Sequence, residues 1–241
     1  SFSRALTSFQ SSRDPFRILC TLPHLSSDAP SPRRPVRPVR DLVILDSSFN
    51  PPTLAHAGMA RSALRDLGAK NNEEGKRLML LLSVNNADKA PKPASFPVRL
   101  CMMEAMGREL LDEVEGLEID VAVTTMPFFH DKARATTETD FYACEGQQPT
   151  MTFLAGFDTL VRIFNPKYYG EGMQRALGPF FEESRVRITT RPDETWGGTR
   201  EQRAWLTAER LGDFGGDEAW TGRVEVVEGE KGDEEGRGDW W

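Results

Sequence analysis

The segment 42–56 constrains the fold of this chain more than any other stretch. It opens with the apolar run Leu-Val-Ile-Leu, whose aliphatic and β-branched side chains are typical of a buried strand. A turn, Ser-Ser-Phe-Asn-Pro-Pro, ends the strand, and prolines are tolerated at or just before the start of a helix. An amphipathic segment follows, with Thr53 and His56 in its first turn. The order strand, turn, helix predicts a helix N-terminus that points its N–H groups at a phosphate above the strand.

From residue 40 onward, strand-like and helix-like segments alternate, which favours a parallel sheet. Strands are expected at 42–46, 78–84, 117–123, 149–155, 186–190 and 223–227. Helices are expected at 53–67, 96–114, 158–164, 172–183 and 199–211. The pattern predicts the α/β class: a Rossmann-like, doubly wound parallel sheet with helices on both faces, in a single domain with an N-terminal extension. Ligands of such sheets bind above the carboxyl ends of the strands, where the connectivity reverses.

The chain divides into three predicted parts. Residues 1–39 form an N-terminal extension with weak helical spacing, a short strand at 16–22 and an extended Pro/Ser/Arg linker. Residues 40–228 form the α/β domain. Residues 229–241 form an acidic, glycine-rich tail that is expected to be disordered.

Composition excludes several classes of function. The net charge of −7 gives no basic signal for a nucleic-acid partner, and no apolar run approaches the ~20 residues that span a bilayer. Three scattered cysteines form no CxxC pair and no disulfide framework, so we expect a reduced compartment, cytoplasmic and/or nuclear. The arginine- and serine-rich, acid-poor start also fits a mitochondrial transit peptide, and that alternative stays open. The oligomeric state is left undetermined.

The residues Ser48-Phe49-Asn50-Pro51-Pro52-Thr53-x-x-His56 resemble the nucleotide-binding signature of the nucleotidylyltransferase superfamily. The nearest match is the nicotinamide mononucleotide adenylyltransferase family, in its fungal adenylyltransferase-like branch. Ser47 stands where that family usually has glycine. The alternative is an ordinary strand–helix turn with an incidental histidine.

Further positions resemble the same family. The loop after the second core strand carries Asn85, expected near the substrate, and Lys89, expected at a phosphate; a solvent-exposed lysine is the alternative. Arg99, at the start of the next helix, is expected to orient that loop. Gly156 and Asp158 resemble a Gly-x-Asp motif in which glycine allows close approach and the carboxylate binds a ribose hydroxyl or caps the helix.

Two more positions bear on the ligands. Arg191 resembles the arginine of a Ser/Thr-Arg-Pro turn and is expected to face the adenine or the mononucleotide phosphate. Phe128 and Phe129 lie where the family has a tryptophan that stacks on the pyridine ring, so either is expected to stack instead.

The resemblance implies an enzyme that transfers the adenylyl group of ATP to a mononucleotide, with Mg²⁺ accompanying ATP and no metal site of its own. His56, Thr53 and Lys89 are the expected catalytic residues, and Ser48, Phe49, Asn50, Gly156, Asp158 and Arg191 the expected nucleotide-binding ones. Nicotinamide mononucleotide is the first candidate acceptor. The family's second signature, Ser-x-Thr-x-x-Arg, is not found, and we expect the sequence to be truncated before it. A cytidylyltransferase, or a nucleotide-binding or ATP-hydrolysing regulatory protein of the same fold, remains the alternative.

Overall fold

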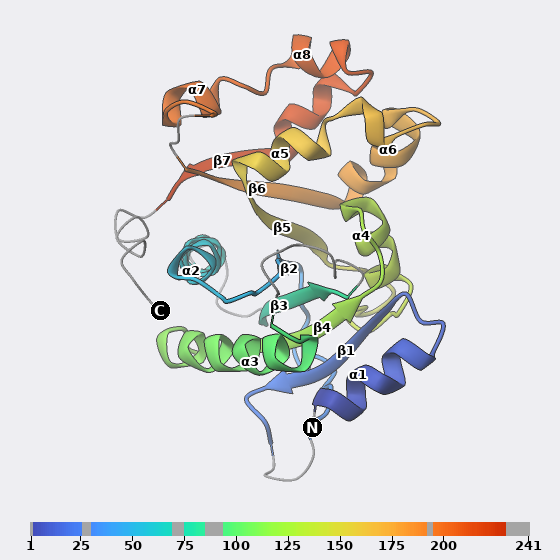
Figure 1. Ribbon diagram of the computed structural model, residues 1–241, viewed down its shortest axis with the longest axis vertical. Helices are drawn as coiled ribbons and strands as arrows, with labels where there is room; N and C mark the ends of the chain where they lie inside the picture. Colours follow the sequence, from blue (N-terminus) through green and yellow to red (C-terminus); the bar gives the residue numbers. More distant parts are fainter. Residues whose placement is uncertain (1, 26–29, 69–74, 85–93, 192–194, 230–241) are drawn as a thin grey trace.

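The structure is a computed structural model that describes residues 2–25, 30–68, 75–84, 94–191 and 195–229 (Figure 1). These residues form a seven-stranded sheet in the order β1-β4-β3-β2-β5-β6-β7. The strands are β1 (Phe16–Leu22), β2 (Asp41–Asp46), β3 (Lys76–Ser83), β4 (Leu117–Thr124), β5 (Thr150–Gly156), β6 (Ser184–Thr190) and β7 (Val224–Glu228). The predicted α/β class with a mostly parallel sheet is confirmed.

The connectivity places a ligand site beside β2. All neighbouring strands pair in parallel, apart from β1, which is antiparallel to β4. After β1 at one edge, the chain crosses to β2 in the middle of the sheet, extends through β3 and β4 back to β1, and then returns to add β5 on the other side of β2. The carboxyl ends of β2 and β5 therefore flank the point where the strand order reverses, which is where doubly wound sheets bind their ligands.

Helices cover both faces of the sheet (Figure 1). One face packs against α1 (Phe2–Ser11), α2 (Leu54–Gly68) and α3 (Phe96–Glu113). The other face packs against α4 (Phe129–Thr137), α5 (Phe157–Ile163), α6 (Met173–Glu183) and α8 (Ala208–Asp213). Successive residues of a strand point to opposite faces, and both faces are covered, which is why β2 is apolar throughout rather than alternating.

Two elements differ from the sequence-based expectation. Residues 129–137, expected as a loop, form helix α4, because its buried face consists of small or polar residues that give no apolar periodicity. The single helix expected at 199–211 is two short helices, α7 (Thr199–Arg203) and α8. The break has a local cause: Thr207 accepts a hydrogen bond from the amide of Arg210 and so starts a new helix.

The segment that precedes β2 is fastened to the sheet by a buried polar network. Arg77 on β3 and Asp120 on β4 are both fully buried and form an ion pair of 2.7 Å from Nε to Oδ2. Thr21 of β1 donates to Asp120 at 2.5 Å, and Arg77 donates to the carbonyl of Arg33 at 2.5 Å. Strand β1 and the segment around residue 33 are therefore held by the same charges that join β3 to β4.

In the ranges that the structure describes, no helix is long and apolar enough to cross a membrane.

Candidate active site

The turn after β2 is built around a buried phenylalanine. Phe49 has a φ of +45°, in the region that side chains rarely adopt, and its ring is fully buried in the core beneath α2. The ring lies 5.6 Å from the ring of His56, measured between centroids. Burial of the ring offsets the backbone strain and fixes the turn. Ser47, at the position where the family has glycine, is not among the residues with positive φ. Phe49, expected as a nucleotide-binding residue, therefore supports the imidazole of His56 from the core side of the turn.

Thr53 and His56 form a reciprocal helix cap. Thr53 lies one residue before α2, and its Oγ1 accepts a long hydrogen bond of 3.4 Å from the amide of His56. In return, the Nδ1 atom of His56 accepts the amide proton of Thr53 at 2.9 Å. This is the arrangement of a capping box, with histidine in the position that glutamate or glutamine usually takes. The Thr-x-x-His spacing thus fixes where the helix starts and also holds the imidazole of His56 in place.

The cap also sets the tautomer of His56. Because Nδ1 accepts from the Thr53 amide, the proton of the neutral ring lies on Nε2. Nε2 is 2.7 Å from the Oγ atom of Ser47, to which it donates. Burial lowers the pKa of His56 below its ordinary value of 6.5, so the ring is neutral at physiological pH. His56 is therefore a hydrogen-bond donor here, and not a base.

The N-terminus of α2 offers further donors. Within the described residues, the amides of Leu54 and Ala55 have no hydrogen-bond acceptor, as expected for the first turn of a helix. Together with the donor of His56, they lie at the reversal point of the sheet. This is a suitable place for the oxygens of a phosphate group.

Ser48 and Asn50 connect the turn to the segment that leads into α3. Asn50 accepts the amide proton of Ala94 through Oδ1 at 2.8 Å. Buried Arg99 donates to the carbonyl oxygens of Ala94 at 2.7 Å and of Ser48 at 3.4 Å. Arg99 therefore orients the end of the predicted loop, as expected. Asn85 and Lys89 themselves lie outside the described residues.

Gly156 and Asp158 lie at the carboxyl end of β5, next to β2. Gly156 is the residue before α5, and a Cβ added to it would lie 3.1 Å from Oδ1 of Asp158. Asp158 makes no capping hydrogen bond, so the expected cap is absent. Its carboxylate instead pairs with Arg162 at 3.3 Å, and both side chains are more than half exposed. Such an exposed pair contributes little stability, which leaves the carboxylate accessible to a ligand.

Arg191 is anchored through its backbone rather than its side chain. The fully buried Gln202 of α7 accepts the amide proton of Arg191 at 3.0 Å and donates to its carbonyl at 2.7 Å. The side chain of Arg191 is thus exposed, while its backbone just beyond β6 is held in place by Gln202. Sequence reasoning did not identify Gln202, because its partner is eleven residues away along an irregular segment.

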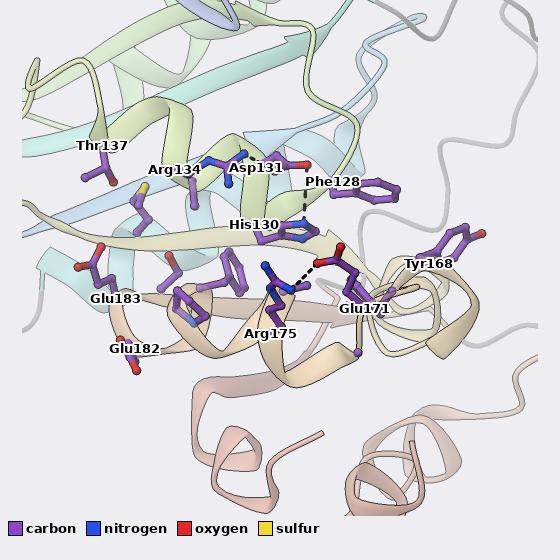
Figure 2. Close-up of a pocket in the computed structure, with 18 of the residues that line it drawn as sticks. Phe128, His130, Asp131, Arg134, Thr137, Tyr168, Glu171, Arg175, Glu182 and Glu183 are labelled. Atoms are coloured by element: carbon purple, nitrogen blue, oxygen red, sulfur yellow. Dashed lines mark hydrogen bonds and ion pairs between the residues drawn. The ribbon is translucent and has the colours of Figure 1, made fainter. Parts of the chain in front are cut away.

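The two phenylalanines after β4 have different surroundings. Phe129 packs edge-on against buried Phe153 of β5, with ring centroids 5.2 Å apart, and so belongs to the core. Phe128 instead stacks on His130, at 5.6 Å and nearly parallel, and faces Tyr168 at 6.1 Å (Figure 2). Of the two expected stacking residues, Phe128 lines the pocket between α4 and α6, and Phe129 is not among the residues that line it.

That pocket lies between α4 and α6 and has a volume of about 580 Å³ (Figure 2). Its aromatic end is formed by Phe128, His130 and Tyr168, and farther along it is lined by charged side chains such as Arg134 and Glu183. Burial lowers the pKa of His130, with the nearby Arg134 acting in the same direction and Asp131 against it. The aromatic end is therefore lined by uncharged rings.

An ion pair that sequence reasoning missed lies beneath the site. Lys132 on α4 pairs with Asp46, the last residue of β2, and both side chains are less than a tenth exposed. The Nζ atom of Lys132 also lies 5.4 Å from the ring centroid of Phe129. This pair joins α4 to the strand that carries the phosphate-binding turn. In the part of the chain that the structure describes, no group of three or more metal-ligating side chains gathers.

A doubly wound sheet with a capped, donor-rich helix start at its reversal point is the arrangement with which many α/β proteins bind phosphate groups. Comparison with known proteins indicates a family. The chain is 36% identical over 186 residues to a Schizosaccharomyces pombe protein named "Putative nicotinamide mononucleotide adenylyltransferase", a match that covers 77% of the chain. By this match the chain is similar to the nucleotidyltransferase family.

The match spans 62% of the length of that relative. Among solved structures, the chain is similar to a Plasmodium falciparum nicotinic acid mononucleotide adenylyltransferase complexed with APC, at 16% identity and a TM-score of 0.43. That similarity covers 80% of this chain and 76% of the other. No family model matches the sequence.

Proposed function

We propose that the chain transfers the adenylyl group of ATP to the phosphate of a mononucleotide, with nicotinamide mononucleotide as the first acceptor, forming NAD and pyrophosphate. The observation that carries the proposal is the neutral imidazole of His56, held as a donor at the reversal point of the sheet. The similarity to the fission yeast relative supports the same activity.

The reaction suits a site that has donors and needs no base. The phosphate oxygen of the acceptor is already anionic and attacks the α-phosphorus of ATP in line. A bond forms between that oxygen and the α-phosphorus, and the bond to the bridging oxygen breaks as pyrophosphate leaves. The protein must hold two polyanions together and stabilise charge on the oxygens, which positioned N–H groups do well. The amides of Leu54 and Ala55 are the proposed direct donors, and the imidazole of His56, whose Nε2 proton is donated to Ser47 Oγ, belongs to the same donor network.

Magnesium is proposed to enter with ATP. Mg²⁺ is commonly bound through substrate phosphates, water and one or two carboxylates, rather than by a cage of protein side chains. The proposed cofactor is therefore the Mg²⁺ complex of ATP, whose phosphates are oriented by the turn at 47–56.

The acceptor base is proposed to occupy the aromatic end of the pocket between α4 and α6. Phe128 and Tyr168, whose ring centroids lie 6.1 Å apart, form an aromatic wall there against which a planar heterocycle can pack. Asp158, half exposed at the end of β5, is proposed to accept from a ribose hydroxyl, and Arg191 to face the adenine or a phosphate. The proposed contact of Lys89 with a phosphate rests on the family resemblance alone.

The test is product analysis by chromatography. The chain is incubated with Mg²⁺, ATP and either nicotinamide or nicotinic acid mononucleotide, with CTP replacing ATP in a parallel reaction. Dinucleotide and pyrophosphate with ATP, reduced on the order of a hundredfold by His56→Ala, is the expected result. ADP alone, no product, or a preference for CTP would overturn the proposal in favour of a regulatory protein or a cytidylyltransferase.

A further inference from the structure

We infer that the hydroxyl of Ser47 is a direct phosphate-binding group, placed between His56 and the nucleotide. The inference rests on the proposed function, because it assigns a further residue to the same phosphate site. It starts from the hydrogen bond between His56 and Ser47 at the turn. The Nε2 proton of His56 is already donated to Ser47 Oγ at 2.7 Å, so the donor assigned to the ligand is in use.

The direction of this hydrogen bond determines what Ser47 can do. Nδ1 of His56 accepts from the amide of Thr53, so Nε2 must donate and Ser47 Oγ must accept. A hydroxyl that accepts one hydrogen bond still has its own proton to donate. In the described part of the chain, Ser47 Oγ has no hydrogen-bond partner other than Nε2 of His56. The Ser47 proton is therefore available to a ligand.

The position of Ser47 fits that role. It directly follows β2, and its amide donates to the carbonyl of Leu81 on β3 at 3.3 Å, which holds its backbone at the carboxyl edge of the sheet. Its side chain is half buried, beside the start of α2. A phosphate oxygen that replaces solvent there can accept the remaining proton of the Ser47 hydroxyl. The chain of donors from His56 through Ser47 to the phosphate would strengthen both hydrogen bonds.

A contrast with glycine makes the inference specific to this chain. Glycine at this position, as in the family signature, would leave Nε2 of His56 open to the phosphate. Serine closes that approach and supplies its own proton instead. With glycine the phosphate receives its hydrogen bond from His56, and with serine it receives it from the serine hydroxyl. Alanine provides no donor of its own, because its methyl group fills space without donating.

The experiment compares S47A, S47G and S47T, with S83A as the matched control. Ser83 is also half buried and ends the neighbouring strand β3. Affinity for the Mg²⁺ complex of ATP is measured by calorimetry, and kcat and KM are measured for both substrates. For S47A we expect a loss of tenfold to a hundredfold in kcat/KM for ATP, as for a donor to a charged group, with little change in KM for the mononucleotide. S47T should retain activity, and S83A should match the unmodified chain.

The rank of the glycine variant discriminates a phosphate contact from a purely structural role. S47G should lose less than S47A, because it opens the imidazole to the phosphate. If Ser47 only supported the fold, S47G would be equal to S47A or worse, since glycine adds backbone freedom. That order, or an S47A variant equal to the unmodified chain, would overturn the inference. Should S47A fail to fold, the isosteric pair S47T and S47V makes the same comparison.

The two proposals fail in distinguishable ways. If the unmodified chain makes no dinucleotide, the proposed function is wrong, while ATP affinity still ranks the Ser47 variants. If the chain is active and S47A is unimpaired, only the inference on Ser47 is wrong.

Discussion

Substitutions of His56 should separate its role in the helix cap from its role at the phosphate. In the cap, His56 fills the position of the glutamate in a capping box, with Nδ1 accepting the Thr53 amide at 2.9 Å. At the phosphate, only a donor is useful. Alanine removes both functions, whereas glutamate keeps the acceptor and removes the donor. His56→Ala should therefore lose both stability and affinity for ATP, whereas His56→Glu should lose affinity alone.

The magnitudes follow from the contacts. His56→Ala loses the ring's hydrogen bonds with the Thr53 amide and with Ser47 Oγ, worth about 1 kcal/mol each, and a ring contact with Phe49 worth about another. The free energy of unfolding should then fall by about 3 kcal/mol. His56→Glu keeps the cap and adds a favourable charge at the helix N-terminus, so its loss should stay below about 1 kcal/mol. Its carboxylate, however, would repel a phosphate about 4 Å away by about 4 kcal/mol at an effective dielectric constant of 20.

Urea unfolding and calorimetry measure the two effects on the same samples. We expect His56→Glu to bind the Mg²⁺ complex of ATP on the order of a thousandfold more weakly, and His56→Ala about tenfold more weakly. A glutamate variant as unstable as the alanine variant would refute the capping argument. A glutamate variant that binds ATP normally would refute the assignment of the turn as the phosphate site.

Other perturbations test the remaining parts of the structure. Burial lowers the pKa of His56 and His130, so the unfolded chain takes up more protons and the free energy of unfolding should fall as the pH drops below about 6.5, measured by urea unfolding at pH 7.5 and 5.5. Asp120→Ala removes the fully buried partner of Arg77 and leaves that guanidinium with the partly exposed Glu118 as its ion-pair partner, so it should cost about 3–5 kcal/mol in the same assay; a loss below 1 kcal/mol would contradict the network. Phe128→Ala should raise KM for the mononucleotide several-fold with little loss of stability, whereas Phe129→Ala should destabilise the fold; equal effects would refute the distinction.

The fold could be predicted because its signals are local. Buried parallel strands such as β2 and β3 have continuous apolar runs, Leu42 to Leu45 and Leu78 to Leu82, and amphipathic segments separate them. Helix α4 has no such signal, because its buried positions are Lys132, Ala133, Ala135 and Thr136. The lysine is buried only because Asp46 lies opposite it, and Asp46 is 86 residues away in the sequence. A pairing at that separation leaves no trace in the spacing of residues.

The sequence indicated which residues form the site, but not which of them contact one another. The spacing of Thr53 and His56 correctly indicated a helix start. It did not reveal that the two side chains bind each other, or that Phe49 supports the imidazole from the core. It also treated Ser47 only as a departure from glycine. Which atom of a histidine donates depends on a third group, and here that group is a backbone amide, which has no sequence signature.

That amide also decides between two chemistries for the same pair of side chains. A serine 2.7 Å from a histidine has the spacing of a hydrolase dyad, in which the unprotonated Nε2 takes the serine proton. Here the Thr53 amide occupies Nδ1, so the proton lies on Nε2 and the histidine cannot activate the serine. We therefore expect ¹⁵N spectra of the imidazole to show His56 as the Nε2-protonated tautomer at pH 7.5. The Nδ1-protonated tautomer, or covalent labelling of Ser47 by a serine-directed phosphonate, would favour the dyad and remove the argument for a donor.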